Sequence, residues 1–223
     1  MGVSGLTLLL ADGRLPTGGH THSGGLEPAI LAGLAQGEIP AFMRGRLHTI
    51  GLTDASLAAH ASRCADRGAQ DDLDRLDREA LARLASPPLR AASRALGSSL
   101  LRTAGQLLPD ARTIVAYRSR SKCTPRSVAL GVVASAAGLS PIDTATISLH
   151  DDLMSVASAA VKLLPVDSGT AYSWVAQLSG ELQRVAEAAA GATSLRDLPS
   201  YSAPACELRS LVHQSNERRL FAT

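Results

Sequence analysis

The sequence predicts an all-α protein: a single globular domain of about eight to nine packed helices with an irregular C-terminal tail. Ala and Leu, the strongest helix formers, make up roughly a third of the 223 residues. Hydrophobic residues reach 45%, enough to bury a full core, yet aromatic residues are only 3%. Because β-sandwiches and barrels are richer in β-branched and aromatic residues, and no strand alternation is convincing, we expect helices throughout.

The N-terminal region is predicted to be a loop followed by a helix. A short apolar run, Leu6–Leu10, leads into a glycine-rich stretch that Pro16 and Gly18 keep irregular. A helix is expected to begin near Ser23, whose hydroxyl can cap free backbone N–H groups, and to stop at Gly37. Its apolar residues recur at helical spacing.

The middle of the chain reads as three helical segments. Pro40–Gly68 has helical spacing with a possible break at Gly51. Asp71–Ala85 alternates leucines with a charged face, as in an amphipathic surface helix. Ser86 is followed by two prolines that can start another helix, and this helix is expected to end before Pro109.

The C-terminal half is predicted to contain a loop and then three helices. Pro109–Arg126 is polar and basic and is expected to be a loop or linker. Val128–Ala137 is a buried small-residue helix, and a further helix opens at Ser140-Pro and runs to about Leu164. A last long helix is expected over Ala171–Ala190.

We expect residues 1–200 to form one all-α domain and residues 201–223 to form a C-terminal tail. The tail has a short helical candidate near Cys206–His213 and ends in an apolar Leu-Phe pair after two arginines. Such a segment either becomes ordered on a partner or is a frayed terminus, and the residues alone leave both readings open.

Charge and cysteine content exclude several classes of protein. A net charge of +2 with few aromatic residues does not indicate nucleic-acid binding. The cysteines, Cys64, Cys123 and Cys206, are odd in number and far apart, so we expect a reducing compartment rather than a disulfide framework. No signal peptide or membrane-spanning stretch is convincing, so the protein is expected to be cytoplasmic.

The residues show no recognisable active site. His20 and His22 lie in the glycine-rich loop and could meet at a nickel, zinc or copper ion, but two ligands do not make a tight site, and an ordinary polar loop is the alternative. Asp151 and Asp152 are helical neighbours that point in different directions, so no shared site is expected of them. With no nucleophile elbow and no phosphate-binding loop, we expect an interaction or scaffold protein, not an enzyme.

At this point five stretches of the sequence resemble, in order, the motifs of the urease accessory protein UreF family. The sequence departs from the family pattern in three places: His20 stands where an apolar residue is frequent, Lys162 stands where Arg is usual, and Pro165-Val-Asp-Ser-Gly replaces a Pro-Leu-Gly-Gln-like stretch. The matching stretches are Leu9–Glu27, Ser93–Arg102, Val128–Leu139, Ser158–Pro165 and Arg218–Thr223.

The resemblance implies a function. Members of the family are all-α, cytoplasmic and non-catalytic. They join a UreD-type protein, called UreH in some species, recruit the UreG-type GTPase, and so assist nickel insertion into apo-urease. The resemblance also implies a homodimeric adaptor without a cofactor, with no nucleic acid and no membrane among its partners. Two alternatives stay open: direct regulation of the GTPase activity of UreG, and a nickel-binding chaperone role for the loop of His20 and His22.

The resemblance also implies a set of partner-binding residues and no catalytic, cofactor or metal site. The N-terminal motif would shape a surface or inter-subunit passage near the GTPase, and the closing motif would become ordered against the UreD-type partner. The simpler alternatives are that the two glycines only permit a tight start to the helix and that the glutamate only balances the helix dipole. The set is His22, Ser23, Gly24, Gly25, Leu26, Glu27, Arg94, Arg102, Lys162, Arg218, Arg219, Leu220 and Phe221.

Overall fold

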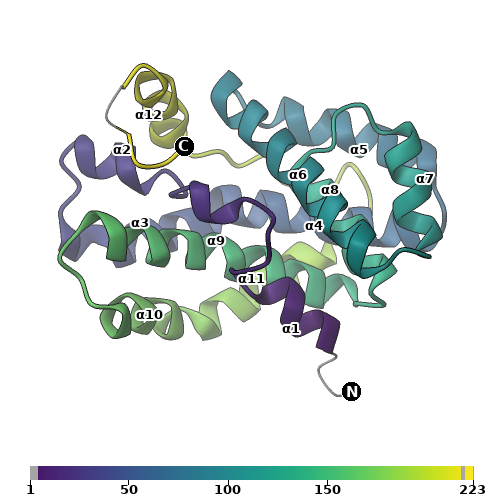
Figure 1. The fold of residues 1–223 in the computed structure, drawn as a ribbon, viewed down its shortest axis with the longest axis horizontal. Coiled ribbons are helices and arrows are strands. Elements are labelled where there is room, and N and C mark those ends of the chain that lie inside the picture. Colours follow the sequence, from purple (N-terminus) through teal and green to yellow (C-terminus); the bar gives the residue numbers. More distant parts are fainter. Residues whose placement is uncertain (1–4, 217–218, 223) are drawn as a thin grey trace.

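The computed structural model describes residues 5–216 and 219–222, which are helical with no strand among them (Figure 1). This confirms the all-α prediction, although the helices outnumber the eight or nine expected. In chain order they are α1 (Gly5–Ala11), α2 (Leu26–Leu31), α3 (Ile39–Arg46), α4 (Leu52–Asp66), α5 (Gln70–Ala82), α6 (Pro87–Leu107), α7 (Arg112–Arg120), α8 (Arg126–Ala136), α9 (Pro141–Leu163), α10 (Ser168–Gln177), α11 (Ser179–Gly191) and α12 (Pro204–Gln214). None of these helices is both long enough and apolar enough to cross a bilayer.

Helices α3 and α4 form one continuous rod through a π-helical turn, Leu47–Gly51. The break expected at Gly51 is therefore a change of helix type rather than an interruption. A Cβ atom on Gly51 would lie 3.0 Å from the carbonyl oxygen of Arg46 and 3.2 Å from Leu149 of α9. The small residue thus allows the widened turn to pack against α9.

Helix α4 separates two hydrophobic cores and contributes to both. Leu57, Ala58 and Ala61 face the core formed with α5, α6, α7 and α8. Ala55 and Ala59 face the core formed with α2, α3, α9, α10 and α11. Helix α4 is buried nearly all round, and polar residues such as Ser56 and His60 are buried on it together with its alanines.

Helices α4 and α8 pack closely because a glycine lies at their crossing. A Cβ atom on Gly131 would collide with the carbonyl oxygen of Ala58 and the side chain of Ala61. Helix α8 is the small-residue helix that the sequence predicts, and it is buried from Ser127 to Ala134. The low helix propensity of glycine is offset here by close packing of the two backbones.

The prediction of a loop over Pro109–Arg126 is wrong, because α7 occupies the centre of this segment. Two apolar residues three positions apart, Ile114 and Tyr117, are buried against α8. The Tyr117 hydroxyl finds a buried acceptor in Asp77 of α5. Two anchors and one hydrogen bond stabilise a short helix whose other residues are exposed or only partly buried.

The single long helix expected over Ala171–Ala190 is instead two helices, α10 and α11, which meet at Leu178. Leu178 is buried and belongs to the core, so the bend keeps apolar residues of both helices inward. The start of α9 agrees with the prediction. Ser140 Oγ accepts a hydrogen bond from Asp143 N–H, and the Asp143 carboxylate accepts one from Ser140 N–H in return.

The short helix expected near Cys206–His213 is present as α12, which packs against α2 and the start of α6 (Figure 1), so the tail is less irregular than expected. The buried carboxylate of Glu207 accepts a hydrogen bond of 2.6 Å from the backbone N–H of Ser86. The hydroxyl groups of Ser86 and Ser210 lie 2.5 Å apart. These contacts fix α12 beside the N-terminal loop and so position the candidate site.

Candidate functional site

The N-terminal motif turns sharply between α9 and α12. Gly24 and Gly25 have φ angles of +60° and +78°, which side-chain-bearing residues rarely adopt. A Cβ atom on Gly24 would lie 2.9 Å from Val156 of α9. Ser23 is fully buried, and its hydroxyl accepts a hydrogen bond of 3.3 Å from the N–H of Glu27. The N-cap of α2 is nevertheless Gly25 and not Ser23, and the helix ends at Leu31 rather than at the expected Gly37.

The carboxylate of Glu27 joins the N-terminal motif to the C-terminal end of the described chain. One oxygen accepts a 2.7 Å hydrogen bond from Leu220 N–H, and the other accepts a 2.9 Å bond from Phe221 N–H. His213 Nε2 of α12 lies 3.3 Å from the same carboxylate. Glu27, His213 and Phe221 are all buried, so these contacts are shielded from water.

Two further contacts hold this C-terminal segment, residues 219–222. The Ala222 N–H donates a hydrogen bond of 2.8 Å to the carbonyl oxygen of Thr21 in the N-terminal loop. The Phe221 ring belongs to the core around α9, and the Lys162 ammonium lies 5.3 Å from its centroid. By contrast, 63% of Leu220 is exposed.

A charged cavity of about 150 Å³ lies behind the N-terminal motif. The buried Arg46 guanidinium pairs with Asp152, and Arg126 pairs with Asp151. The sequence prediction that the two aspartates share no site is therefore wrong, because both line this cavity, each through a different arginine. They leave α9 in different directions, but an arginine from α3 and another from α8 reach toward them.

Two titratable groups in the cavity are shifted by burial. Burial raises the pKa of Asp54 to about 6, and the nearby Asp152 carboxylate raises it further, against the opposing effect of Arg126 and Arg46. Burial and the Arg126 guanidinium lower the pKa of His22. Sequence reasoning missed Arg46, Asp54 and Arg126, since nothing in the linear order of these residues shows that they meet.

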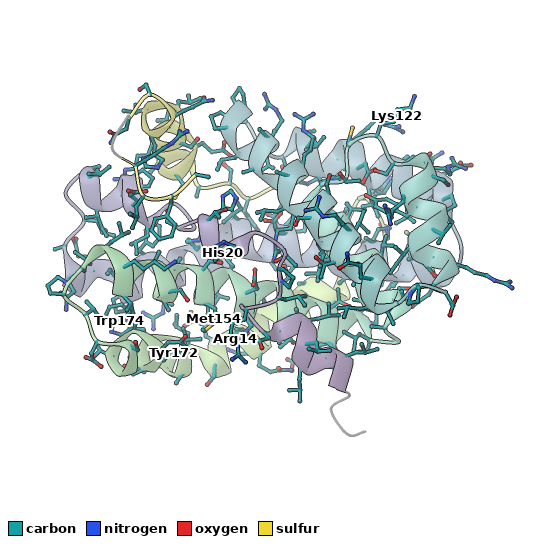
Figure 2. The ribbon with its side chains drawn as sticks, in the orientation of Figure 1. Arg14, His20, Lys122, Met154, Tyr172 and Trp174 are labelled. Carbon is teal, nitrogen blue, oxygen red and sulfur yellow. The ribbon has the colours of Figure 1, made fainter. Side chains whose placement is uncertain are left out.

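A groove of about 480 Å³ lies between the N-terminal loop and helices α9 and α10. His20, His22, His150, Met154 and Tyr172 are among the residues that line it, and Figure 2 shows His20, Met154 and Tyr172 on the same side of the molecule. Within residues 5–216 and 219–222, no group of three or more His, Cys, Asp or Glu side chains is arranged to hold a metal ion.

An exposed apolar face lies on α2, α12 and the C-terminal segment. We use this name for five large aliphatic side chains that are 46–74% exposed: Leu31, Leu208, Leu211, Val212 and Leu220. A groove of about 460 Å³ runs between α2 and α12, lined by Leu31, Leu208 and Val212. Exposed aliphatic side chains that gather along one groove, as Leu31, Leu208 and Val212 do, mark protein interaction sites.

Comparison with known proteins decides the family. A family model described as UreF matches residues 35–179, more than half of the chain. The chain belongs to the UreF family. It is 36% identical over 218 residues to the urease accessory protein UreF of Mycolicibacterium vanbaalenii, and the comparison covers 97% of each chain. It is 38% identical over 224 residues to the UreF protein of Mycobacterium marinum, with 98% of each covered, and 35% identical over 219 residues to that of Mycobacterium tuberculosis, with 97% of each covered.

The UreF assignment confirms the resemblance found in the sequence. The UreF family is one of accessory proteins, and this chain is a urease accessory protein rather than an enzyme. The family match begins at residue 35, after the N-terminal motif, and ends before the C-terminal segment. The full-length relatives, however, align over 97–98% of the chain.

The residues that the UreF resemblance singled out fall into two groups in the structure. Residues 22–27, Lys162, Leu220 and Phe221 come together where the N-terminal motif meets the C-terminal segment. Arg94 and Arg102 are exposed on α6 and bond within their own helix, to the Arg90 carbonyl and the Ser99 hydroxyl. Arg219 is exposed and donates to the Gln214 carbonyl, and Arg218 lies outside the described residues.

Proposed function

We propose that this chain is a cytoplasmic, non-catalytic adaptor that joins a UreD/UreH-type protein and recruits a UreG-type GTPase for nickel insertion into apo-urease. The observation that supports this best is the exposed apolar face beside the C-terminal segment. The proposal assigns this face to the UreD/UreH-type partner. We further propose that the adaptor acts as a homodimer, as the resemblance implies.

The apolar face has the character of an interface core with a polar rim. Val212 is 74% exposed, Leu208 66% and Leu31 62%, so a partner that covers them removes a large apolar area from water. Arg209 and Asn216 line the same groove and supply polar groups at its edge. Apolar burial then stabilises the complex, and the rim orients it.

The groove between the N-terminal loop and α9 is the surface that we assign to the UreG-type GTPase. It carries His20, His22 and Lys162, together with the Phe221 ring. Its Lys162 ammonium group favours a partner surface that carries carboxylates, since the Asp12 and Asp151 carboxylates of the groove are already paired with Arg14 and Arg126. Because Phe221 lies in this groove and Leu220 in the apolar face, the two proposed surfaces meet at the C-terminal segment.

Co-purification with the UreD/UreH-type and UreG-type proteins of the same source tests the proposal. Leu208→Glu and Val212→Glu place a charge on the apolar face without disturbing the core. Val115→Glu is the matched control, since Val115 is 60% exposed on α7 at the other end of the molecule. We expect the two face variants to weaken capture of the UreD/UreH-type protein at least about tenfold and the control to retain it. Equal capture by all three variants, or none by the folded wild type, contradicts the proposal.

A nickel-binding chaperone is a second candidate, favoured by the presence of His20, His22 and His150 in one groove. Imidazole is a suitable ligand for nickel. Calorimetric titration of the tag-free chain with nickel tests this function. Binding by the wild type that is lost in a His20→Ala/His22→Ala variant supports it, and the absence of binding by the wild type removes it.

Direct regulation of the GTPase is tested in the assembled complex. GTP turnover by the UreG-type protein is measured with and without this chain, and again with Arg94→Ala and Arg102→Ala. Both arginines are exposed on α6, so their removal leaves the fold intact. A change in turnover that either variant abolishes indicates direct regulation, and unchanged turnover leaves the adaptor role.

A further inference from the structure

We propose that the charged cavity behind the N-terminal motif binds a small organic cation, an alkylammonium or alkylguanidinium ion, with the carboxylate of Asp54 as its counter-ion. Such a ligand contacts residues of this chain alone. Its binding therefore does not depend on the protein partners proposed above.

The charged side chains that line the cavity include one carboxylate more than they include cationic groups. Arg46 bonds to both oxygens of Asp152 through its Nε and Nη2 atoms, and Arg126 pairs with Asp151. Each arginine is thus neutralised by an aspartate of its own. Asp54 of α4 lines the same cavity as a third carboxylate, and no third arginine or lysine faces it there. The cavity therefore attracts a cation when Asp54 is ionised.

The Asp54 carboxylate is short of partners that stabilise its charge. Within the described part of the chain, no donor forms a hydrogen bond with it. Burial and the like charge of Asp152 oppose its ionisation more strongly than Arg126 and Arg46 support it, which raises its pKa to about 6. A buried carboxylate without donors is costly. A cation that carries N–H groups supplies both the opposite charge and the donors.

Ser148 of α9 gives a second, independent indication of a ligand. It is only 5% exposed, and it lines the cavity. The hydroxyl groups of Thr144, Thr146 and Ser155 on the same helix each donate to the carbonyl oxygen four residues earlier. The Ser148 hydroxyl forms no such bond and has no other hydrogen-bond partner among the described residues. Buried hydroxyl groups generally have a partner, so this one is available to a group inside the cavity.

The size and the apolar part of the lining favour an organic cation over a metal ion. Leu89, Ala92 and Leu96 of α6, with Leu84 just before that helix, form an apolar wall. The volume of about 150 Å³ equals that of about five water molecules. The methyl or methylene groups of an organic cation can cover the apolar wall, while its N–H groups face Asp54 and Ser148. A metal ion would leave that wall uncovered.

The charge of Asp54 makes the affinity depend on pH. We expect binding at about pH 7.5, where Asp54 is ionised, and much weaker binding at about pH 5, where it is protonated. Burial and the Arg126 guanidinium lower the pKa of His22, so its imidazole is neutral at the higher pH and does not repel the ligand. The titratable and charged groups that line the cavity with Asp54 are His22 of the N-terminal loop, Arg46 of α3, Arg126 of α8, Asp151 and Asp152 of α9, and Cys206 of α12.

Isothermal titration calorimetry of the full-length chain with methylguanidinium tests the site. N-Methylurea is the matched control ligand, because it has the same shape and size but no charge. At about pH 7.5 we expect methylguanidinium to bind at least about tenfold more tightly than N-methylurea, and at about pH 5 we expect this preference to disappear. No binding of methylguanidinium, or equal affinity for the two ligands at the higher pH, overturns the proposal.

Two substitutions in the cavity locate the binding groups. Asp54→Asn removes a buried charge, so the variant should fold, and we expect it to lose at least about tenfold in affinity for methylguanidinium. Ser148→Ala should lose about threefold to tenfold, since it removes one hydrogen bond. Glu187→Gln is the control, an exposed glutamate on α11 that does not line the cavity, and should bind as the wild type does. Wild-type affinity in both cavity variants would show that the ligand binds elsewhere and would refute the proposal.

A metal ion is the alternative occupant, and titration with nickel chloride alone decides between the two. If the chain binds the nickel ion, if Asp54→Asn abolishes that binding, and if methylguanidinium does not bind, the cavity is a metal site and the proposal is wrong. If methylguanidinium binds and Asp54→Asn leaves any affinity for nickel unchanged, the organic cation is the ligand of the cavity. Neither result bears on the capture of protein partners, which is measured separately.

Discussion

The hydroxyl group of Tyr117 donates a 2.5 Å hydrogen bond to the carboxylate of Asp77, and both side chains are buried between α7 and α5. The Ser121 hydroxyl donates to the second oxygen at 2.6 Å. Burial raises the pKa of both groups, and the adjacent carboxylate opposes ionisation of the tyrosine as well. This buried contact ties α7, the helix that the sequence did not predict, to α5.

Tyr117→Phe removes the donor to one Asp77 oxygen and leaves the Ser121 hydroxyl as donor to the other. We expect the free energy of unfolding to fall by about 1–3 kcal/mol, since a buried charged acceptor loses a hydrogen bond. Urea denaturation measures the change. Tyr201→Phe is the control, because Tyr201 is 56% exposed, and it should change the midpoint very little. Equal midpoints for the two variants would contradict the expectation.

Asp54→Asn should stabilise the protein at neutral pH. The folded state raises the pKa of Asp54 from 3.8 to about 6, so it binds this proton more tightly than the unfolded state does. The free energy of unfolding therefore falls as the pH rises from about 4 to about 6 and is reduced by a constant amount above that range. The asparagine variant does not ionise and avoids this loss.

Thermal unfolding at two pH values measures the effect of Asp54→Asn. At about pH 7.5 we expect the variant to be more stable than the wild type by about 1–3 kcal/mol, and below about pH 4 the two should agree. Asp110→Asn, at an exposed position, is the control. A variant with the same advantage at both pH values would show that ionisation of Asp54 is not the cause.

Two glycine substitutions should have opposite effects. Gly131→Ala places a methyl group against the Ala58 carbonyl at the crossing of α4 and α8, and we expect a loss of about 1–3 kcal/mol. Gly45→Ala, in α3, meets nothing within 4 Å and should gain about 0.5–1 kcal/mol from higher helix propensity. Denaturant midpoints on either side of the wild-type value confirm this contrast, and two shifts in the same direction refute it.

Arg46→Met should destabilise the protein more than a double substitution that also removes its partner. Arg46 is buried and neutralises Asp152 inside the cavity, close to Asp54. We expect the single change to lower the free energy of unfolding by about 3 kcal/mol, because an unpaired carboxylate stays behind, and Arg46→Met/Asp152→Leu to recover much of it. A double-mutant cycle on the unfolding free energies measures the coupling. Additive effects would show that the pair is not coupled.

Helices with strong local signals were predictable from the sequence. Ser140 with Asp143 three positions later marks the start of α9, and the Ser86-Pro-Pro sequence marks the start of α6. Helix α7 was missed because only two of its residues, Ile114 and Tyr117, are buried, and its basic residues dominate the local composition. The bend at Leu178 is followed directly by Ser179 and Gly180, a pair at which helices often kink, and the apolar spacing of the segment hid this signal.

The candidate site was predictable only in part. The glycines and the serine of the N-terminal motif announce a tight turn before a helix, and the structure confirms this. The contact between Glu27 and residues 220–221 spans almost the whole chain, and a backbone N–H leaves no trace in the sequence. The cavity could not be predicted for a similar reason, since Arg46 and Asp152 meet only after α3 and α9 have packed.

The continuous rod of α3 and α4 has a consequence for how the protein unfolds. Because α4 forms a wall of both cores, neither core can come apart while the other keeps its full set of contacts. Heat or denaturant should therefore melt the whole chain in a single cooperative transition, with equal calorimetric and van't Hoff enthalpies. The two cores are separate in space, but they unfold together.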